Sequence, residues 1–233
     1  MYDPAINHRT SRPVLDGAAL DSAIDEARAE LAALLRAPGG GEPSRLTGAR
    51  ALLGSLLDRR VALTAARLDD RDARTVAAAR ADRNEAIAVT GAQLYWLPAG
   101  DAAWPEVALT LGRLSYDRYT DPWPDTEPPD PDDLDAACDL LLRGARYEDA
   151  DERTTLYLFL ALRDRRHLMA CPGDARALMT WGERLMAFPE AGGLGRSGLH
   201  DMLQLELLTR TRVPGGSWGP WGVRPTGLAA AFV

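Results

Sequence analysis

Apolar residues recur every three or four positions along most of this chain, a spacing that places them on one face of an α-helix. The first such stripe, in residues 18–36, consists of Leu20, Ile24, Ala27, Leu31, Leu34 and Leu35. Residues 43–67 carry a second stripe of the same kind. No segment alternates apolar and polar residues over the length of a strand. The pattern therefore predicts an all-α protein.

Clusters of proline, glycine and aspartate divide the rest of the chain into further helices. Residues 38–41 read Pro-Gly-Gly-Gly and end the first helix, and residues 121–131 contain five prolines and four acids, which excludes a helix there. Between and after these breaks we expect helices at residues 71–97, 104–119, 132–146, 150–167, 173–188 and 197–212.

Three segments of different character follow from this division. Residues 1–16 form an N-terminal extension without periodicity, residues 17–212 a helical domain, and residues 213–233 a tail rich in glycine, proline and tryptophan. Exposing Trp218 and Trp221 of that tail to water would be unfavourable. We therefore expect both tryptophans to fold back onto the last helix or to dock on another molecule.

The charge and cysteine content narrow the class of protein. All 27 basic residues are arginine, yet the net charge is −7, which argues against a protein that binds the nucleic-acid backbone. No stretch is long and apolar enough to cross a membrane, and residues 1–13 lack the hydrophobic core of a signal peptide. Two cysteines do not make a disulfide framework in a chain of 233 residues. These features favour a cytoplasmic protein.

A helix-pair pattern recurs along the chain. The first helices align as Leu53-Gly54-Ser55-Leu56, Leu111-Gly112-Arg113-Leu114 and Leu158-Phe159-Leu160-Ala161, and an arginine follows seven residues after the first leucine of each (Arg60, Arg118 and Arg165). The second helices align best at residues 20–24 and 134–138. One helix pair cannot bury its own apolar face, whereas stacked pairs share a continuous core. The repetition therefore predicts stacked helix pairs.

These residues resemble the tetratricopeptide (TPR) pattern, because Leu-Gly stands on the first helix and Ala137, Leu141 and Gly144 fit the second. The style of the copies also resembles repeat regions beside actinobacterial caspase-like CHAT proteases. Over residues 18–188, the resemblance implies an irregular α-solenoid of antiparallel pairs, capped by the helix at 197–212. The spacing departs from the usual 34 residues, and Phe159 replaces the expected glycine. An irregular helical bundle is the alternative.

The expected function is that of an adaptor or scaffold whose helical groove holds a protein or peptide partner. The groove residues would be Arg113, Tyr116, Arg118, Arg163 and Arg166, which suit acidic or carboxylate-ended peptides. The alternative for Arg118 and Arg165 is that they pair with acids of the neighbouring helix. Trp123, Trp218 and Trp221 are the aromatic residues that we expect a partner, such as an effector or protease subunit, to bury.

Other candidate chemistry is less specific. His167 and Cys171 have the spacing of a base and a nucleophile, so a helical tailoring enzyme or hydrolase is the alternative function, and a self-associating scaffold is a third. The acids of residues 69–72 and 132–135 stand at expected helix starts, where carboxylates cap exposed amides. Residues 193–198 match G-x-G-x-x-G without a preceding strand, so we expect a flexible link. No cofactor or metal is expected.

Overall fold

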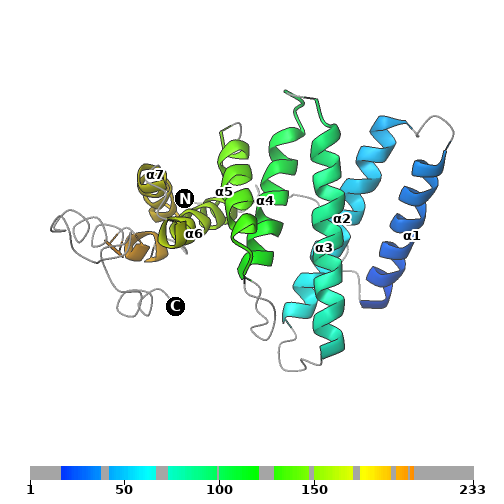
Figure 1. Cartoon of the computed structure of the whole chain (residues 1–233), viewed down its shortest axis with the longest axis horizontal. Helices are drawn as coiled ribbons and strands as arrows, with labels where there is room; N and C mark the ends of the chain where they lie inside the picture. The colour runs from blue at the N-terminus through cyan, green and yellow to red at the C-terminus, as the bar shows by residue number, and fades with distance from the viewer. Residues whose placement is uncertain are drawn as a thin grey trace, which may run out of the picture. The chain divides into compact units, whose positions relative to one another are not determined.

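The computed structural model describes residues 17–37, 42–66, 73–98, 100–120, 129–146, 150–169, 174–189, 193–198 and 200–201. The regular secondary structure of these residues is helical and includes no strand, which confirms the all-α prediction (Figure 1). The helices are α1 (Gly17–Arg36), α2 (Pro43–Ala66), α3 (Ala73–Trp96), α4 (Trp104–Thr120), α5 (Pro131–Gly144), α6 (Glu152–Met169) and α7 (Asp174–Met186). Their ends fall within two residues of the sequence predictions.

The chain divides into two compact units, of which the first ends at Trp96 and the second begins at Leu97. Helices α1 to α3 belong to the first unit and α4 to α7 to the second. None of the helices in the described part of the chain has the length and apolarity that a bilayer crossing requires.

In the first unit, α2 packs against both α1 and α3. Helices α1 and α2 supply fully buried apolar side chains, among them Leu20, Ile24, Leu53 and Leu57. The buried stripe of α3 is different, because its members are small or polar: Ala79, Asp82, Arg83, Ala86, Thr90 and Gln93. Helix α3 therefore contributes mainly small and polar groups to the interior of this unit.

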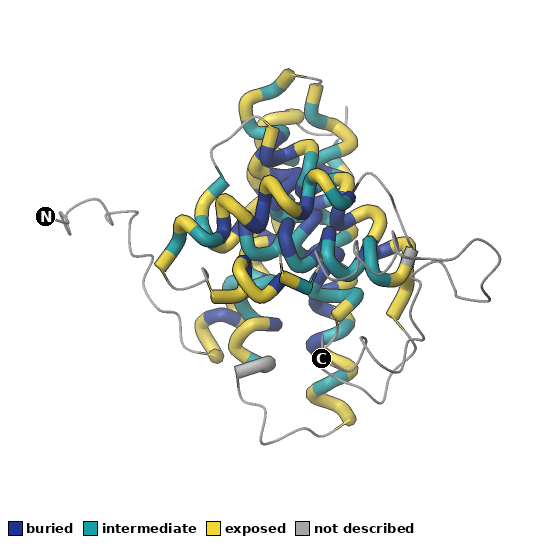
Figure 2. The backbone as a smooth tube through the Cα atoms, turned by 90° about the vertical axis from the view of Figure 1, so that its left-hand side faces the viewer, coloured by how far each residue is buried: buried dark blue, intermediate teal, exposed yellow. Residues whose placement is uncertain are grey.

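In the second unit, α4 packs on α5, α5 on α6 and α6 on α7, with a further contact between α4 and α6. These helices enclose one apolar cluster that includes Leu134, Leu141, Phe159 and Trp181. Figure 2 colours the buried positions of the backbone dark blue. The apolar helix faces predicted from the spacing of leucine and alanine thus form the core of this unit.

Glycines allow close helix packing in both units. A Cβ atom on Gly54 of α2 would lie 3.0 Å from Thr90 Oγ1 of α3, and one on Gly112 of α4 would lie 2.8 Å from Leu141 Cγ of α5. Gly144 of α5 is equally restricted, because its Cβ would lie 2.6 Å from Leu109 Cγ. The glycines noted in the repeat therefore mark points of close approach between paired helices.

Residues 193–198 are helical, so the expectation that they form a flexible link is wrong. Their glycines serve packing: a Cβ on Gly195 would lie 2.9 Å from the backbone oxygen of Gly182, and one on Gly198 only 2.1 Å from Phe159 Cζ. Most of the predicted helix 197–212 lies outside the described residues, as do the tail 213–233 and the extension 1–16.

Candidate functional site

The three arginines of the repeat make the same contact in three helix pairs. Arg60 of α2 donates from Nε to Asp82 Oδ2 of α3 at 2.7 Å and from a terminal nitrogen to Oδ1 at 2.5 Å. Arg165 of α6 forms the equivalent two-pronged contact with Asp174 of α7, at 2.9 and 2.7 Å. Parallel hydrogen bonds of this kind fix both the distance and the orientation of two groups.

Arg118 of α4 completes the series, donating from Nε to Asp133 Oδ2 of α5 at 2.6 Å and from a terminal nitrogen to Oδ1. Asp133 is buried, and hydrogen bonding to it raises the pKa of Arg118 against the opposing effect of burial. The alternative interpretation of Arg118 and Arg165, that they pair with acids of the neighbouring helix, is confirmed. That Arg118 binds a partner stays a prediction.

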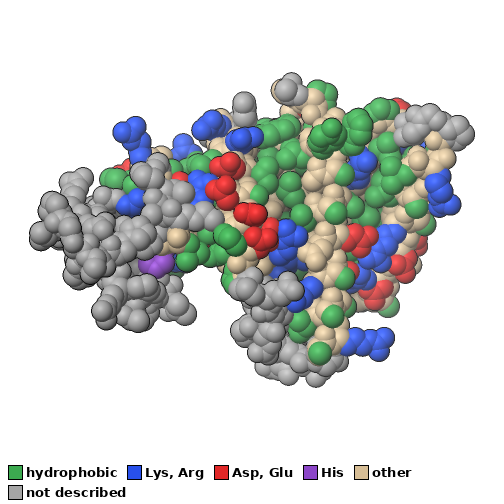
Figure 3. Space-filling model, in the orientation of Figure 1, with side chains coloured by type: hydrophobic (Ala, Val, Ile, Leu, Met, Phe, Trp, Pro, Cys, Tyr) green, Lys and Arg blue, Asp and Glu red, His purple; other side chains and the backbone are tan. Residues whose placement is uncertain are grey.

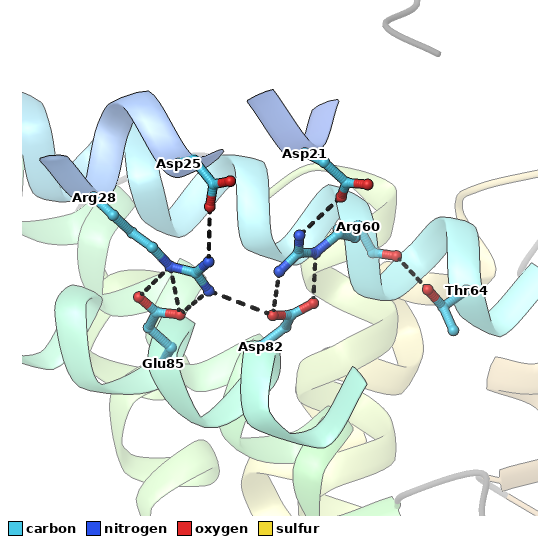
Figure 4. Close-up of polar contacts among 7 residues, drawn as sticks. All are labelled: Asp21, Asp25, Arg28, Arg60, Thr64, Asp82 and Glu85. Atoms are coloured by element: carbon cyan, nitrogen blue, oxygen red, sulfur yellow. Dashed lines mark hydrogen bonds and ion pairs between the residues drawn. The ribbon is translucent and has the colours of Figure 1, made fainter. Parts of the chain in front are cut away.

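Two of these arginines also reach the helix before their own. Arg60 contacts Asp21 Oδ1 of α1 at 2.8 Å, and Arg165 contacts Asp135 and Asp139 of α5 at 2.9 and 3.3 Å. In the first unit, Arg28 of α1 adds contacts to Glu85 and Asp82, so that one network connects α1, α2 and α3 (Figure 4). The guanidinium groups of Arg60 and Arg165 therefore each connect three helices through charge-assisted hydrogen bonds.

A second group of polar contacts joins α4 to α6. The Tyr116 hydroxyl donates to Asp164 Oδ2 at 2.6 Å, and Arg163 donates from Nε to Oδ1 of the same carboxylate at 2.9 Å. Tyr116 is buried, whereas Arg163 and Asp164 are partly exposed. Two of the predicted site residues, Tyr116 and Arg163, are thus brought together on one carboxylate.

Two further tyrosines extend this group. The ring of Tyr116 lies 6.1 Å from that of Tyr119 on α4 and 6.0 Å, edge to face, from that of Tyr157 on α6. The guanidinium of Arg153 lies 5.7 Å from the Tyr157 ring, within the range of a cation–π contact. We call Tyr116, Tyr119, Tyr157, Arg163 and Asp164 the α4–α6 cluster.

Burial changes the protonation behaviour of the cluster. It raises the pKa of Tyr116, which the negative charge of Asp164 raises further, so the phenol keeps its proton and donates it to the carboxylate. Burial likewise raises the pKa of Tyr157, with Asp117 adding to the effect. The pKa of His167 is lowered by burial, against the opposing influence of Asp164. The imidazole is therefore neutral at neutral pH.

The remaining predicted arginines lie near the cluster on the same two helices. Arg113 of α4 donates to Thr110 Oγ1 at 3.4 Å, and its Nε is buried without a hydrogen-bond partner among the described residues. Arg166 of α6 is half-buried, and burial lowers its pKa despite the opposing charge of Asp174. Neither guanidinium takes part in the repeated arginine–aspartate contacts.

Several predicted residues cannot be placed. Cys171, Trp123, Trp218 and Trp221 lie outside the described residues, so the base–nucleophile pair of His167 and Cys171 is untested. The other cysteine, Cys138, is fully buried in the core, where burial raises the pKa of its thiol to about 12.

The acids near residue 132 act at the start of a helix, as expected, with one correction of detail. The cap of α5 is Asp130, whose side chain accepts a hydrogen bond from the backbone N–H of Asp132 at 2.9 Å. Asp132 lies in the first turn, and Asp133 is committed to Arg118. Acidic side chains of α5 remain exposed on the face seen in Figure 3.

Sequence reasoning missed Tyr119, Tyr157 and Asp164 as members of a site. A signal existed, because Tyr157 and Asp164 are seven residues apart and therefore share one face of a helix. The sequence alone did not show that α4 and α6 are neighbours, because Tyr116 and Asp164 are 48 residues apart in the chain. Aromatic faces beside carboxylates and guanidinium groups can bind charged side chains of either sign.

The described residues define an all-helical protein in which arginine–aspartate contacts join successive helices within each unit. No family model, no curated protein sequence and no solved structure matches this chain. The functional inference therefore depends on its own residues.

Proposed function

We propose that this protein is a cytoplasmic adaptor, a TPR-like stack of helix pairs that presents one face to a protein or peptide partner. The observation that carries the proposal is the repeated contact of Arg60, Arg118 and Arg165 with an aspartate of the following helix. Three copies of one linkage support a repeating unit made of α2 with α3, α4 with α5, and α6 with α7. Stacked units of this kind typically offer an extended binding surface.

The packing of the second unit supports the same proposal. Pro105 and Leu109 lie beside Gly144, whereas Gly112 lies beside Ala137 and Leu141, as expected for two helices that run in opposite directions. The contact between α4 and α6 supports the stacking of one pair on the next, with first helices adjacent. A bundle of unrelated helices would not require the same arginine in each pair.

The α4–α6 cluster is the proposed partner surface, and its charges favour an acidic or carboxylate-ended peptide. Arg163 forms an ion pair with the adjacent Asp164. A partner carboxylate can take the place of Asp164 on Arg163 without breaking any contact between helices. Arg113 and Arg166 add positive charge on the same two helices. An arginine that exchanges one carboxylate for another keeps its hydrogen bonds, so the exchange costs little.

The test is quantitative capture of partners from native lysate by the full chain and by two charge-reversal variants. Arg163→Glu removes the proposed carboxylate contact, whereas Arg176→Glu makes the same change at an exposed position of α7. We expect Arg163→Glu to lose specific partners that Arg176→Glu retains, with unchanged circular dichroism for both. Equal recovery by the two variants would contradict the assigned surface, and no specific partner in any sample would contradict the adaptor.

A truncation tests the predicted role of the tail. A chain that ends at residue 212 lacks Trp218 and Trp221, and we expect it to recover the same partners less efficiently if those rings are buried on binding. Unchanged recovery of partners would show that the tail is not part of the interface. The α4–α6 cluster would then be the remaining candidate for the partner surface.

A further inference from the structure

An exposed aromatic pair ends helix α3. Tyr95 and Trp96 are 80% and 68% exposed, the largest exposed fractions among the large hydrophobic residues of the described chain. Their rings lie edge to face with centroids 5.4 Å apart, so they form one continuous apolar feature. Two adjacent aromatic rings in water are unfavourable and commonly mark a surface that another molecule covers.

The exposed face of α3 that leads to this pair carries almost no charge. Its exposed residues after Arg74 are Thr75, Ala77, Ala78, Ala81, Asn84, Ala88, Tyr95 and Trp96. The outer face of α1, by comparison, exposes Asp21, Asp25, Glu26 and Glu30. In Figure 3 the visible side of α3 is mostly green and tan, with charged side chains gathered toward α1. An exposed helix face with so little charge is unusual in a chain with 26% charged residues.

We infer that two copies of this chain associate through this face, with the two α3 helices running in opposite directions. Arg74, Ala77, Ala81, Asn84, Ala88 and Tyr95 follow one another at alternating spacings of three and four, with one further step at Gly91. This is the heptad spacing that keeps two helices in contact along their length. Small side chains at these positions let the two backbones approach closely.

The ends of the face are complementary to each other, which is why the occupant is a second copy. A twofold axis between Asn84 and Glu85 places Ala81 of each copy opposite Ala88 of the other. The same axis places Arg74 of each copy over Tyr95 and Trp96 of the other, where guanidinium and aromatic rings attract each other. Both ends of the interface are satisfied at once, and no third component is needed.

The test is the mass of the full chain in solution as a function of concentration, measured by sedimentation equilibrium. We expect the mass to rise from 25.2 kDa toward twice that value. Ala88→Glu places a charge in the middle of the face and should weaken association at least tenfold. Its matched control is Ala33→Glu on the exposed side of α1, which should leave association unchanged. Glutamate is a good helix former, so both variants should keep their helical content.

A charge exchange tests the direction of packing. In a chain with Ala81→Arg and Ala88→Glu, antiparallel helices place each introduced arginine beside the introduced glutamate of the other copy, so association should recover relative to Ala88→Glu alone. Trp96→Ala should weaken association through loss of the cation–π contact. A monomer at every concentration, or a dimer that Ala88→Glu leaves intact, would overturn the proposal. Failure of the double variant to recover would overturn the antiparallel arrangement.

Discussion

The two units of this chain use the same arginine–aspartate linkage but different interiors. In the first unit α3 buries Asp82, Arg83, Thr90 and Gln93, and a network of charges connects it to α1 and α2 (Figure 4). The second unit encloses a large apolar cluster around Phe159, and it also buries the ion pair of Arg165 and Asp174, whose side chains are 8% and 6% exposed. The same ion pair between helices can therefore occur with different kinds of interior.

The difference has an energetic consequence. Apolar burial stabilises in proportion to area and tolerates small shifts, whereas a buried ion pair must hold its geometry to offset the cost of desolvation. Both units should thus be sensitive to the loss of a buried carboxylate, and the second should be sensitive in addition to the loss of a single large side chain from its apolar cluster. Three substitutions, taken from the largest expected effect to the smallest, test this contrast.

Phe159→Ala should produce the largest loss. The side chain is almost fully buried at the centre of the apolar cluster, and truncation of such a ring typically costs about 3–5 kcal/mol of unfolding free energy. Urea unfolding followed by circular dichroism measures the effect. Leu194→Ala, at an exposed position of the 193–198 segment, is the control and should change stability by less than about 0.5 kcal/mol. A similar loss of unfolding free energy for both variants would contradict the conclusion that the apolar cluster stabilises the second unit.

Asp82→Asn should be the most damaging charge substitution in the first unit. It removes the carboxylate that binds Arg60 and lies near Arg28, and we expect a loss of about 2–3 kcal/mol. The value lies below that of a fully buried pair because the Arg60 side chain is 25% exposed. Asp25→Asn, whose carboxylate is 76% exposed, should cost less than about 1 kcal/mol in the same unfolding assay. Equal effects would show that the network does not hold the helices together.

His167→Gln should have the smallest effect, visible only on acidification. Burial lowers the pKa of His167 below 6.5 in the folded protein, so between the two values the unfolded chain binds more protons. This group therefore makes stability fall as the pH drops through that window, and has no effect above it. We expect acidification from about pH 7.5 to about pH 5 to destabilise the native chain more than the variant. Parallel pH curves from thermal unfolding would contradict the assignment.

Helix positions could be predicted from the sequence because they depend on local periodicity and on proline, glycine and aspartate breaks. Gly54 and Gly112 were recognised for the same reason, since close approach leaves a local mark in the sequence. The glycines of residues 193–198 led to the wrong prediction of a flexible link. A helix can include glycine where a neighbouring side chain occupies the space of a Cβ atom, as the Phe159 ring does beside Gly198.

The partners of polar side chains could be predicted only in kind. That Arg118 and Arg165 bind acids of an adjacent helix followed from repetition and charge, yet the particular acid did not. Asp174 is the first residue of its helix, whereas Asp82 lies ten residues into α3. The choice depends on how far one helix slides along the other, which side-chain volumes throughout the interface decide. The contact between Tyr116 and Asp164 escaped prediction for the same reason.

The junction between Phe159 and Gly198 implies that two positions far apart in the chain cannot vary independently. The benzyl ring fills the volume that any β-carbon at residue 198 would need, whereas Gly112 in the preceding pair yields its space to Leu141. A smaller residue at 159 combined with a larger one at 198 should lose less stability than the sum of the separate changes. In related chains, those two sites should be inherited as a matched set.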